Sequence, residues 1–317
     1  MFYSIRHSTR FRYSAPITES VMEVRVQPRS EGPQRLLSFE LTVSPRARLQ
    51  AYRDFTGNVV HHFNLPGHHQ ELAITSTAMV EVEDGISFPQ HLPTSAWDEL
   101  DRLVEQGDYW EMLLPSQYCR PTPALRQLAQ EVDARRRDDP LGLLRELTGR
   151  LYDLFEYEPQ STRVDSPIDE ALAQRKGVCQ DFAHIMIALV RELGIPCRYV
   201  SGYLYHRTED ADRSAAGATH AWVEALLPEH GWIGFDPTND LLAGDRHIRV
   251  AIGRDYADVP PTRGVFKGQA ASELSVSVTV TPADAPAQEI IVPALTTWIP
   301  LGVREALGDE QQQQQQQ

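Results

Sequence analysis

The chain has 317 residues, of which 30 are basic and 44 acidic, so its net charge at neutral pH is −14. This balance argues against nucleic acid and against an anionic membrane surface as partners, because both attract positive charge. No run approaches the ~18 apolar residues of a membrane span. Met1–His7 lacks the apolar core of a secretory signal, so we expect a cytoplasmic protein. The three cysteines show no zinc-like spacing, which fits reduced thiols better than a disulfide framework.

Residues 1–90 predict a β-rich domain, because apolar and polar residues alternate in segments that Pro, Gly and Ser clusters separate. The predicted strands are Phe2–Tyr13, Glu19–Pro28, Leu36–Ser44 and Glu71–Val82, with a hairpin around the turn Asp54–Asn58. Histidine pairs stand at His61–His62 and His68–His69. Neighbours on a strand point to opposite faces, so these pairs do not form a metal site. We predict no metal and no cofactor.

Residues 91–155 read as a linker followed by helices. The predicted helices are Ala96–Glu105, Thr122–Asp133 and Leu141–Phe155. Pro123 and Pro140 stand at or just before the last two starts, where proline is tolerated. Leucines at helical spacing in the last segment predict a core-facing stripe. This region is therefore expected to pack beside the segment that follows it.

Gly177–Leu193 carries the strongest pattern in the chain. Its apolar residues recur on a 3.6-residue period, which predicts an amphipathic helix. Gly194 and Pro196 end this helix. Cys179 falls in the first turn, where free backbone N–H groups and the helix dipole stabilise a thiolate. Cys179 is therefore a candidate nucleophile, although a small buried cysteine would give the same pattern.

Two predicted strands follow and carry a histidine and an aspartate. Thr219–Ala225 alternates and contains His220, and Trp232–Asp236 returns after a turn at Pro228–Gly231. A hairpin brings His220 near Asp236, with a bulge or a longer turn needed for close register. A cysteine at a helix start, a histidine and an aspartate supply a nucleophile, a base and an orienting group.

At these residues the sequence resembles the bacterial branch of the transglutaminase-like family of papain-type thiol enzymes, which includes cysteine proteases. The matching segments are GVCQDFAH at 177–184, GIPCRYVSGYL at 194–204, HAWVE at 220–224, GWIGFDPTN at 231–239 and HIRVAIGRDYADVPP at 247–261. The resemblance implies that Cys179 is the nucleophile, His220 the general base and acid, and Asp236 the residue that holds the imidazole. It also implies an α+β fold, with residues 1–90 as an N-terminal β-domain. Residues 156–282 would form a core of helices packed on an antiparallel sheet.

Further candidates surround these three residues. The backbone N–H of Cys179 points out of the helix start and is our preferred oxyanion donor. Gln160, Gln180 and Trp222 are additional candidates for the oxyanion or the substrate cleft. His184 lies one turn after Cys179 and is expected beside the helix rather than opposite the thiol. His230 and His247 are expected in turns, and we assign them no role.

These residues predict a thiol enzyme that cleaves a peptide or other amide bond through a thioester on Cys179. Hydrolysis makes it a peptidase or amidase, and attack by an amine makes it a protein-glutamine transglutaminase. No acidic cluster has calcium-loop spacing, which favours hydrolysis. A non-catalytic peptide-binding module is the other alternative. Residues 283–317 read as a tail whose final glutamine run is expected to be disordered, and no oligomeric state is indicated.

Overall fold

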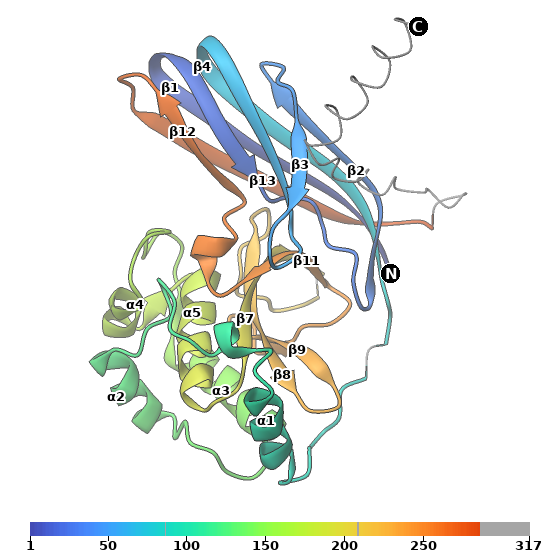
Figure 1. The fold of residues 1–317 in the computed structure, drawn as a ribbon, viewed down its shortest axis with the longest axis vertical. Helices are drawn as coiled ribbons and strands as arrows, with labels where there is room; N and C mark the ends of the chain where they lie inside the picture. Colours follow the sequence, from blue (N-terminus) through green and yellow to red (C-terminus); the bar gives the residue numbers. More distant parts are fainter. Residues whose placement is uncertain (86, 208, 286–317) are drawn as a thin grey trace, which may run out of the picture.

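The computed structural model describes residues 1–285 except residues 86 and 208. These residues form two large sheets and one short two-stranded sheet (Figure 1). The first is a six-stranded antiparallel sheet of order β12-β1-β4-β2, in which β13 also pairs with β1, and β3 with β4. Its strands are β1 (Phe2–Val24), β2 (Gln34–Ser44), β3 (Gln50–Arg53), β4 (Val59–Val82), β12 (Thr262–Lys267) and β13 (Ser272–Ala283). We call this sheet the β-domain.

The two long strands of the β-domain, β1 and β4, form its centre. The sequence predicts two strands where β1 runs continuously, and the register with β4 shifts between Arg12 and Glu19. Side chains that alternate inward pack into a core of their own, which includes Ile17, Phe63 and Leu72. The predicted tail at 283–317 lies almost wholly outside the described residues.

The last two strands return to the β-domain instead of staying with the core. β12 and β13 run antiparallel along β1, with Val24 opposite Thr262 and Phe2 opposite Ala283. The predicted core of residues 156–282 therefore includes strands that belong to the first sheet. Polar and apolar residues alternate along Leu274–Thr281, as expected of a strand, but the pattern of one strand does not specify which edge it joins.

The segment between β4 and β12 forms the core. Its second sheet is antiparallel, with the order β10-β9-β8-β7-β11, and a short parallel pair of β5 and β6 lies outside it. The helices are α1 (Ala96–Glu105), η1 (Trp110–Met112), α2 (Pro123–Glu131), α3 (Pro140–Leu154), α4 (Ile168–Gln174), α5 (Cys179–Glu192) and η2 (Tyr256–Asp258). The strands are β5 (Glu156–Tyr157), β6 (Lys176–Gly177), β7 (Cys197–Leu204), β8 (His220–Leu227), β9 (Gly231–Asp236), β10 (Leu241–Leu242) and β11 (His247–Gly253).

Helix α5 is the centre of the core. It is buried from Gln180 to Arg191 and contacts β7 and β8 on one side and α2, α3 and α4 on the others. The side chains of Thr122 and Asp139 cap α2 and α3 by accepting hydrogen bonds from backbone N–H groups, as N-cap residues do. Helices on an antiparallel sheet, joined to a strand-rich domain, confirm the predicted α+β fold.

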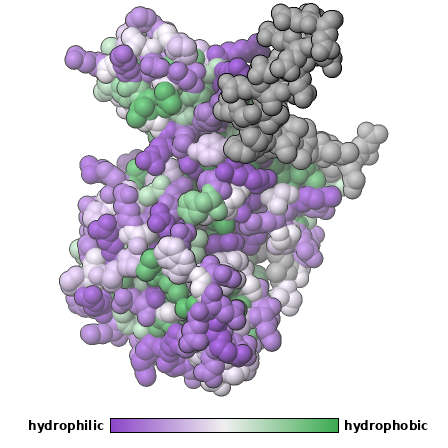
Figure 2. Space-filling model, in the orientation of Figure 1, coloured by the Kyte–Doolittle hydropathy of each residue, from purple (hydrophilic) through white to green (hydrophobic). Residues whose placement is uncertain are grey.

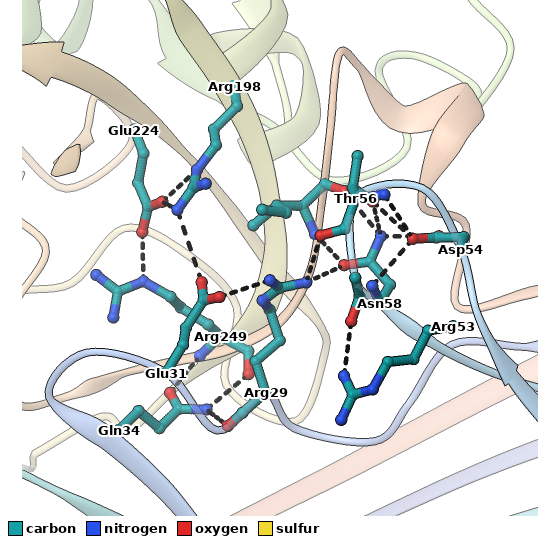
Figure 3. A network of polar contacts seen from close by, with 12 residues as sticks. Arg29, Glu31, Gln34, Arg53, Asp54, Thr56, Asn58, Arg198, Glu224 and Arg249 are labelled. Carbon is teal, nitrogen blue, oxygen red and sulfur yellow. Dashed lines mark hydrogen bonds and ion pairs between the residues drawn. The ribbon is translucent and has the colours of Figure 1, made fainter. Parts of the chain in front are cut away.

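Side-chain amides of the β-domain hold the outer edge of β11, the last strand of the second sheet (Figure 3). Gln34 accepts a hydrogen bond from the N–H of Arg249 (2.7 Å) and donates one to its carbonyl (2.9 Å). Asn58 does the same with Ile252, at 2.9 and 2.8 Å. Each amide therefore replaces one residue of a neighbouring strand, and together they satisfy backbone groups that an edge strand otherwise exposes.

A buried carboxylate lies at the same junction (Figure 3). Glu224 on β8 is fully buried, and its two oxygens accept hydrogen bonds from the Nε atoms of Arg198 and Arg249. Glu31 of the β-domain lies 3.7 Å from Arg198 and joins this group to the first sheet. One buried negative charge thus offsets two guanidinium groups that are themselves largely removed from water.

Glu224→Gln is expected to lower the free energy of unfolding by about 3–5 kcal/mol, because it leaves buried arginines without their counter-charge. Urea denaturation followed by circular dichroism measures the change. Glu40→Gln on an exposed position of β2 is the matched control, with an expected effect within about 0.5 kcal/mol. An unchanged urea midpoint for Glu224→Gln would show that the buried charge contributes little to stability.

The surface in Figure 2 is mostly hydrophilic, with hydrophobic side chains gathered on the β-domain. Val265, Leu274 and Val276 are exposed on β12 and β13, the outer strands of that sheet. Within residues 1–285, no helix combines the length and apolar character needed to cross a bilayer.

Candidate active site

Cys179 is the first residue of α5, as the sequence predicts. The chain enters this helix from β6 through Val178, whose N–H donates to Asp181 Oδ2 at 2.9 Å. Thr162 donates to the same oxygen at 2.5 Å, so the buried Asp181 side chain fixes the entry to the helix. Cys179 itself is only partly buried. Its sulfur therefore combines a position at the positive end of a helix with access from outside.

His220 and Asp236 come from adjacent antiparallel strands. The hairpin pairs Val223 with Phe235 and Leu227 with Gly231. One further step in this register sets Asp236 opposite Trp222, two residues from His220 and on the same face of the sheet. His220 and Asp236 are therefore diagonal neighbours across the two strands, which is close enough for contact.

The Asp236 carboxylate binds the imidazole of His220 directly. Nε2 of His220 lies 2.7 Å from Oδ2 of Asp236, and both side chains are buried. Burial on its own lowers the pKa of His220, but Asp236 and the Cys179 sulfur outweigh it and raise that pKa to about 10. Burial also disfavours the charged form of Asp236 and so raises its pKa. His220 and His247 lower that pKa by more than burial raises it. The pair therefore consists of an imidazolium and a carboxylate at neutral pH.

The other ring nitrogen of His220 is free to act. Nδ1 is buried and has no hydrogen-bond partner among the residues that the structure describes. The Cys179 sulfur is near enough to raise the pKa of this ring, so it is the group available to Nδ1. Because Nε2 is bound to Asp236, Nδ1 is the nitrogen that can exchange a proton with the sulfur or with a bound molecule.

Sequence reasoning missed two residues that bind Asp236. Nδ2 of Asn239 donates to Asp236 Oδ2 at 2.8 Å, and Nε2 of His247 lies 3.2 Å from the same oxygen. Asn239 also accepts from the N–H groups of Arg213 and Ser214, which ties the loop before β8 to the carboxylate. Both residues lie within the motifs GWIGFDPTN and HIRVAIGRDYADVPP, which was the one signal that could have found them.

Trp222 lies behind the histidines rather than in a cleft. It is fully buried, and its ring lies 6.0 Å from that of His220 and 5.1 Å from that of His247. Glycines on both neighbouring strands make room for it, because a Cβ at Gly202 would come within 2.6 Å of the indole and one at Gly234 within 3.4 Å. Trp222 therefore supports the imidazoles, and its burial leaves it no contact with a substrate.

The two glutamine candidates are placed differently. Gln180 is buried, and its Nε2 donates to the carbonyl of Val164 at 3.0 Å. Gln160 is exposed, with a φ of 67°, and the described residues show no hydrogen bond from it to Cys179 or His220. Among the described residues, no hydrogen bond therefore orients either glutamine side chain toward the Cys179 sulfur.

His184 and the other cysteines lie in the interior. His184 is stacked between the rings of Tyr118 and Tyr199, and its Nε2 accepts from the N–H of Tyr256. Burial lowers the pKa of His184 to about 3, so the ring stays neutral. Cys119 and Cys197 are buried, and burial raises the pKa of both thiols. Cys179 is thus the cysteine suited to react.

His220, Asp236 and His247 also have the composition of a metal site, with ligand atoms within 4.8 Å of one another. Nδ1 of His247, however, accepts a hydrogen bond from the N–H of Gly244 at 3.3 Å. The ring proton of a neutral His247 is therefore on Nε2, which donates to Asp236. The hydrogen bonds from His220 and His247 to Asp236 therefore account for the close approach of the three side chains.

Comparisons with known proteins give the family. The model of the bacterial transglutaminase-like N-terminal region matches residues 3–81, and that of the transglutaminase-like superfamily matches residues 126–237. An uncharacterised protein of Mycobacterium leprae is 35% identical over 277 residues, which cover 87% of this chain and 96% of that protein. The chain belongs to the transglutaminase-like superfamily. Members of this superfamily are typically cysteine-based enzymes.

Two further proteins are similar over a smaller part of the chain or in fold alone. A protein-glutamine gamma-glutamyltransferase of Pseudomonas aeruginosa is 32% identical over 199 residues, which cover 57% of this chain and 27% of that protein. The crystal structure of a candidate cysteine protease from Cytophaga hutchinsonii aligns with a TM-score of 0.69 at 24% identity. This alignment covers 90% of this chain and 92% of that one. Its likeness extends through the β-domain and the core and concerns the fold alone.

Proposed function

We propose that this transglutaminase-like protein is a thiol-dependent acyl-transfer enzyme that cleaves peptide or other amide bonds through a thioester on Cys179. The observation that carries the proposal is the buried His220 ring, which is bound to Asp236 through Nε2 and leaves Nδ1 for the sulfur side. The buried nitrogens of a histidine that only packs a core normally have hydrogen-bond partners. An unpartnered Nδ1 near a thiol at a helix start therefore favours a role in proton transfer.

In the proposed reaction the Cys179 thiolate attacks the carbonyl carbon of the amide. The N–H of Cys179, at a helix position without an intrahelical acceptor, stabilises the oxyanion. As the C–N bond breaks, the His220 imidazolium gives its Nδ1 proton to the leaving amine, and the acyl group stays on the sulfur. Water then attacks the thioester while His220 takes up a proton, and the carboxylic acid leaves as the C–S bond breaks.

A cavity whose wall includes Tyr157, a residue that interacts electrostatically with Cys179, could take a substrate with an extended side chain or peptide. It has a volume of about 640 Å³, and its wall includes Tyr157 and Arg213. Burial raises the pKa of Tyr157, and so does the Cys179 sulfur, which connects this wall to the nucleophile. Asp153, Glu156, Arg175 and Lys176 add both signs of charge to the same wall. We assign the part of the substrate away from the scissile bond to this cavity.

The second candidate is a protein-glutamine transglutaminase, in which an amine replaces water in the last step. The name of the Pseudomonas aeruginosa relative favours it. The first half of the reaction and its residues are the same, so the two candidates differ only in what resolves the thioester.

The test uses an activated ester, p-nitrophenyl acetate, and a library of blocked peptides as acyl donors, with and without a fluorescent primary amine. We expect intact-mass spectrometry to detect an acyl adduct on Cys179. We expect the free acid to be the main product even when the amine is present. An amine conjugate as the main product would identify a transglutaminase instead. Binding of peptides without any adduct or turnover would contradict both and would favour a non-catalytic peptide-binding module.

A further inference from the structure

We propose that His247 is a positioning residue that holds the Asp236 carboxylate against His220. The inference rests on the thiol chemistry proposed above and adds to it a second imidazole on the same carboxylate. Oδ2 of Asp236 faces three nitrogens, on His220 (2.7 Å), Asn239 (2.8 Å) and His247 (3.2 Å). Oδ1 of Asp236 accepts from the N–H of Thr238 at 3.0 Å. Rotation of the carboxylate would break several of these bonds together.

The hydrogen bonds of His247 fix which ring nitrogen carries its proton. Nδ1 accepts from the N–H of Gly244, so Nε2 is the donor toward Asp236. Burial lowers the pKa of His247, although Asp236 opposes this shift, and His220 and Arg246 add to it. His247 is therefore a neutral donor. It orients the carboxylate without competing with His220 for the positive charge.

The ring of His247 is held as firmly as the carboxylate it binds. His247 is the first residue of β11 and pairs with Leu204 of β7 on the inner edge. The outer edge of the same strand is held by Gln34 and Asn58 of the β-domain (Figure 3). The ring itself packs edge-on against Trp222, at 5.1 Å between centroids and 73° between planes.

This geometry assigns His247 a defined effect on His220. The charged and titratable groups that interact with the His220 ring are Asp236, Cys179, His206 and His247 itself. Asp236 alone of these binds Nε2, so any rotation of its carboxylate weakens the stabilisation of the imidazolium. Without the His247 donor, Asp236 would stabilise the imidazolium less against the effect of burial, and the pKa of His220 would fall below about 10.

The test compares His247→Phe with His247→Gln. Phenylalanine keeps the ring against Trp222 and removes the donor, whereas glutamine keeps an N–H near the position of Nε2 and loses the ring. The rate of Cys179 carbamidomethylation by iodoacetamide is measured from pH 5 to 10, and thermal unfolding is followed in parallel. In the wild-type protein, the alkylation rate of Cys179 is expected to change near pH 10, where His220 loses the proton of its imidazolium.

We expect this change in alkylation rate to occur about one pH unit lower in His247→Phe than in wild type. A shift of that size corresponds to the loss of a single modest hydrogen bond to a charge. The imidazolium persists in both proteins at neutral pH, so their alkylation rates should be similar there and should diverge between about pH 9 and 10. His247→Gln should restore most of the wild-type pH profile even where it unfolds at a lower temperature. A role in packing alone predicts the opposite ranking, with phenylalanine better tolerated than glutamine, and that result would overturn the proposal.

The two hypotheses fail in different ways. A wild-type Cys179 that reacts no faster than an ordinary exposed thiol would contradict the proposed function. A fast wild-type Cys179 whose pH profile is unchanged in His247→Phe would contradict only the role of His247. Should His247→Phe not fold, ¹⁵N-histidine spectra of the wild-type protein decide instead. A neutral His247 ring protonated on Nδ1, or a His247 pKa raised above its ordinary value of 6.5, would be incompatible with the proposal.

Discussion

Cys179→Ala is expected to form no acyl adduct and to show no turnover, because the proposed reaction runs entirely through that sulfur. In the wild-type protein, iodoacetamide at neutral pH should modify Cys179 at least about 10²-fold faster than Cys119 or Cys197. The other two thiols are buried, and the pKa of Cys197 is raised to about 11 by its burial. A thiol with that pKa is ionised to only about one part in 10⁴ at neutral pH.

Peptide mapping by mass spectrometry measures the three rates separately. Alkylation in denaturant is the reference, where all three thiols should react alike. A protein that carries Cys119→Ser and Cys197→Ser is the matched control and should keep the fast phase. Equal rates for the three cysteines in the folded protein would refute the activated thiol.

Asp236→Asn is expected to reduce acyl transfer by about 10²–10⁴-fold, the contribution that a correctly oriented acid–base histidine makes. The substitution keeps the size of the side chain and removes the charge. Burial then lowers the pKa of His220 without opposition from the carboxylate, and the ring becomes neutral at pH 7. Cys179 would lose its cationic neighbour, so its alkylation rate at pH 7 should fall as well.

The same substitution changes how stability depends on pH. Folding raises the pKa of His220 from its ordinary value of 6.5 to about 10. The imidazolium therefore stabilises the fold fully below pH 6.5, and this contribution is lost as the pH rises through about 10. Wild type should lose stability between these values, whereas Asp236→Asn should be less stable and flatter there. Asp98→Asn on an exposed position of α1 is the control, and a wild-type curve as flat as that of Asp236→Asn would exclude the pair.

The positions of Cys179, His220 and Asp236 in the fold were predictable from sequence because each depends on a local pattern. A 3.6-residue apolar period sets the start of α5, and therefore the environment of Cys179, within a few residues. Alternation on either side of Pro228–Gly231 places His220 and Asp236 on neighbouring strands. The family motifs then connect these local features into one site.

The support around the site was not predictable, because it depends on contacts between distant segments. His247 looked like a turn residue, and only the pairing of β11 with β7 brings it to Asp236. Trp222 stands in the same strand as His220, and its burial follows from glycines on two other strands. Alternation alone also left open which sheet β12 and β13 join, since strand patterns carry no information on partners.

The path of the chain through the β-domain has a consequence for how the protein can be divided. The core is inserted between β4 and β12, so a fragment cut at its two ends would lose both of its connections to the β-domain. In such a fragment Gln34 and Asn58 would no longer cover the edge of β11. The backbone groups of Arg249 and Ile252 would then be free to pair with a strand of another molecule. Truncated versions should therefore self-associate, and engineering of this scaffold is better done by exchanging surface loops than by trimming domains.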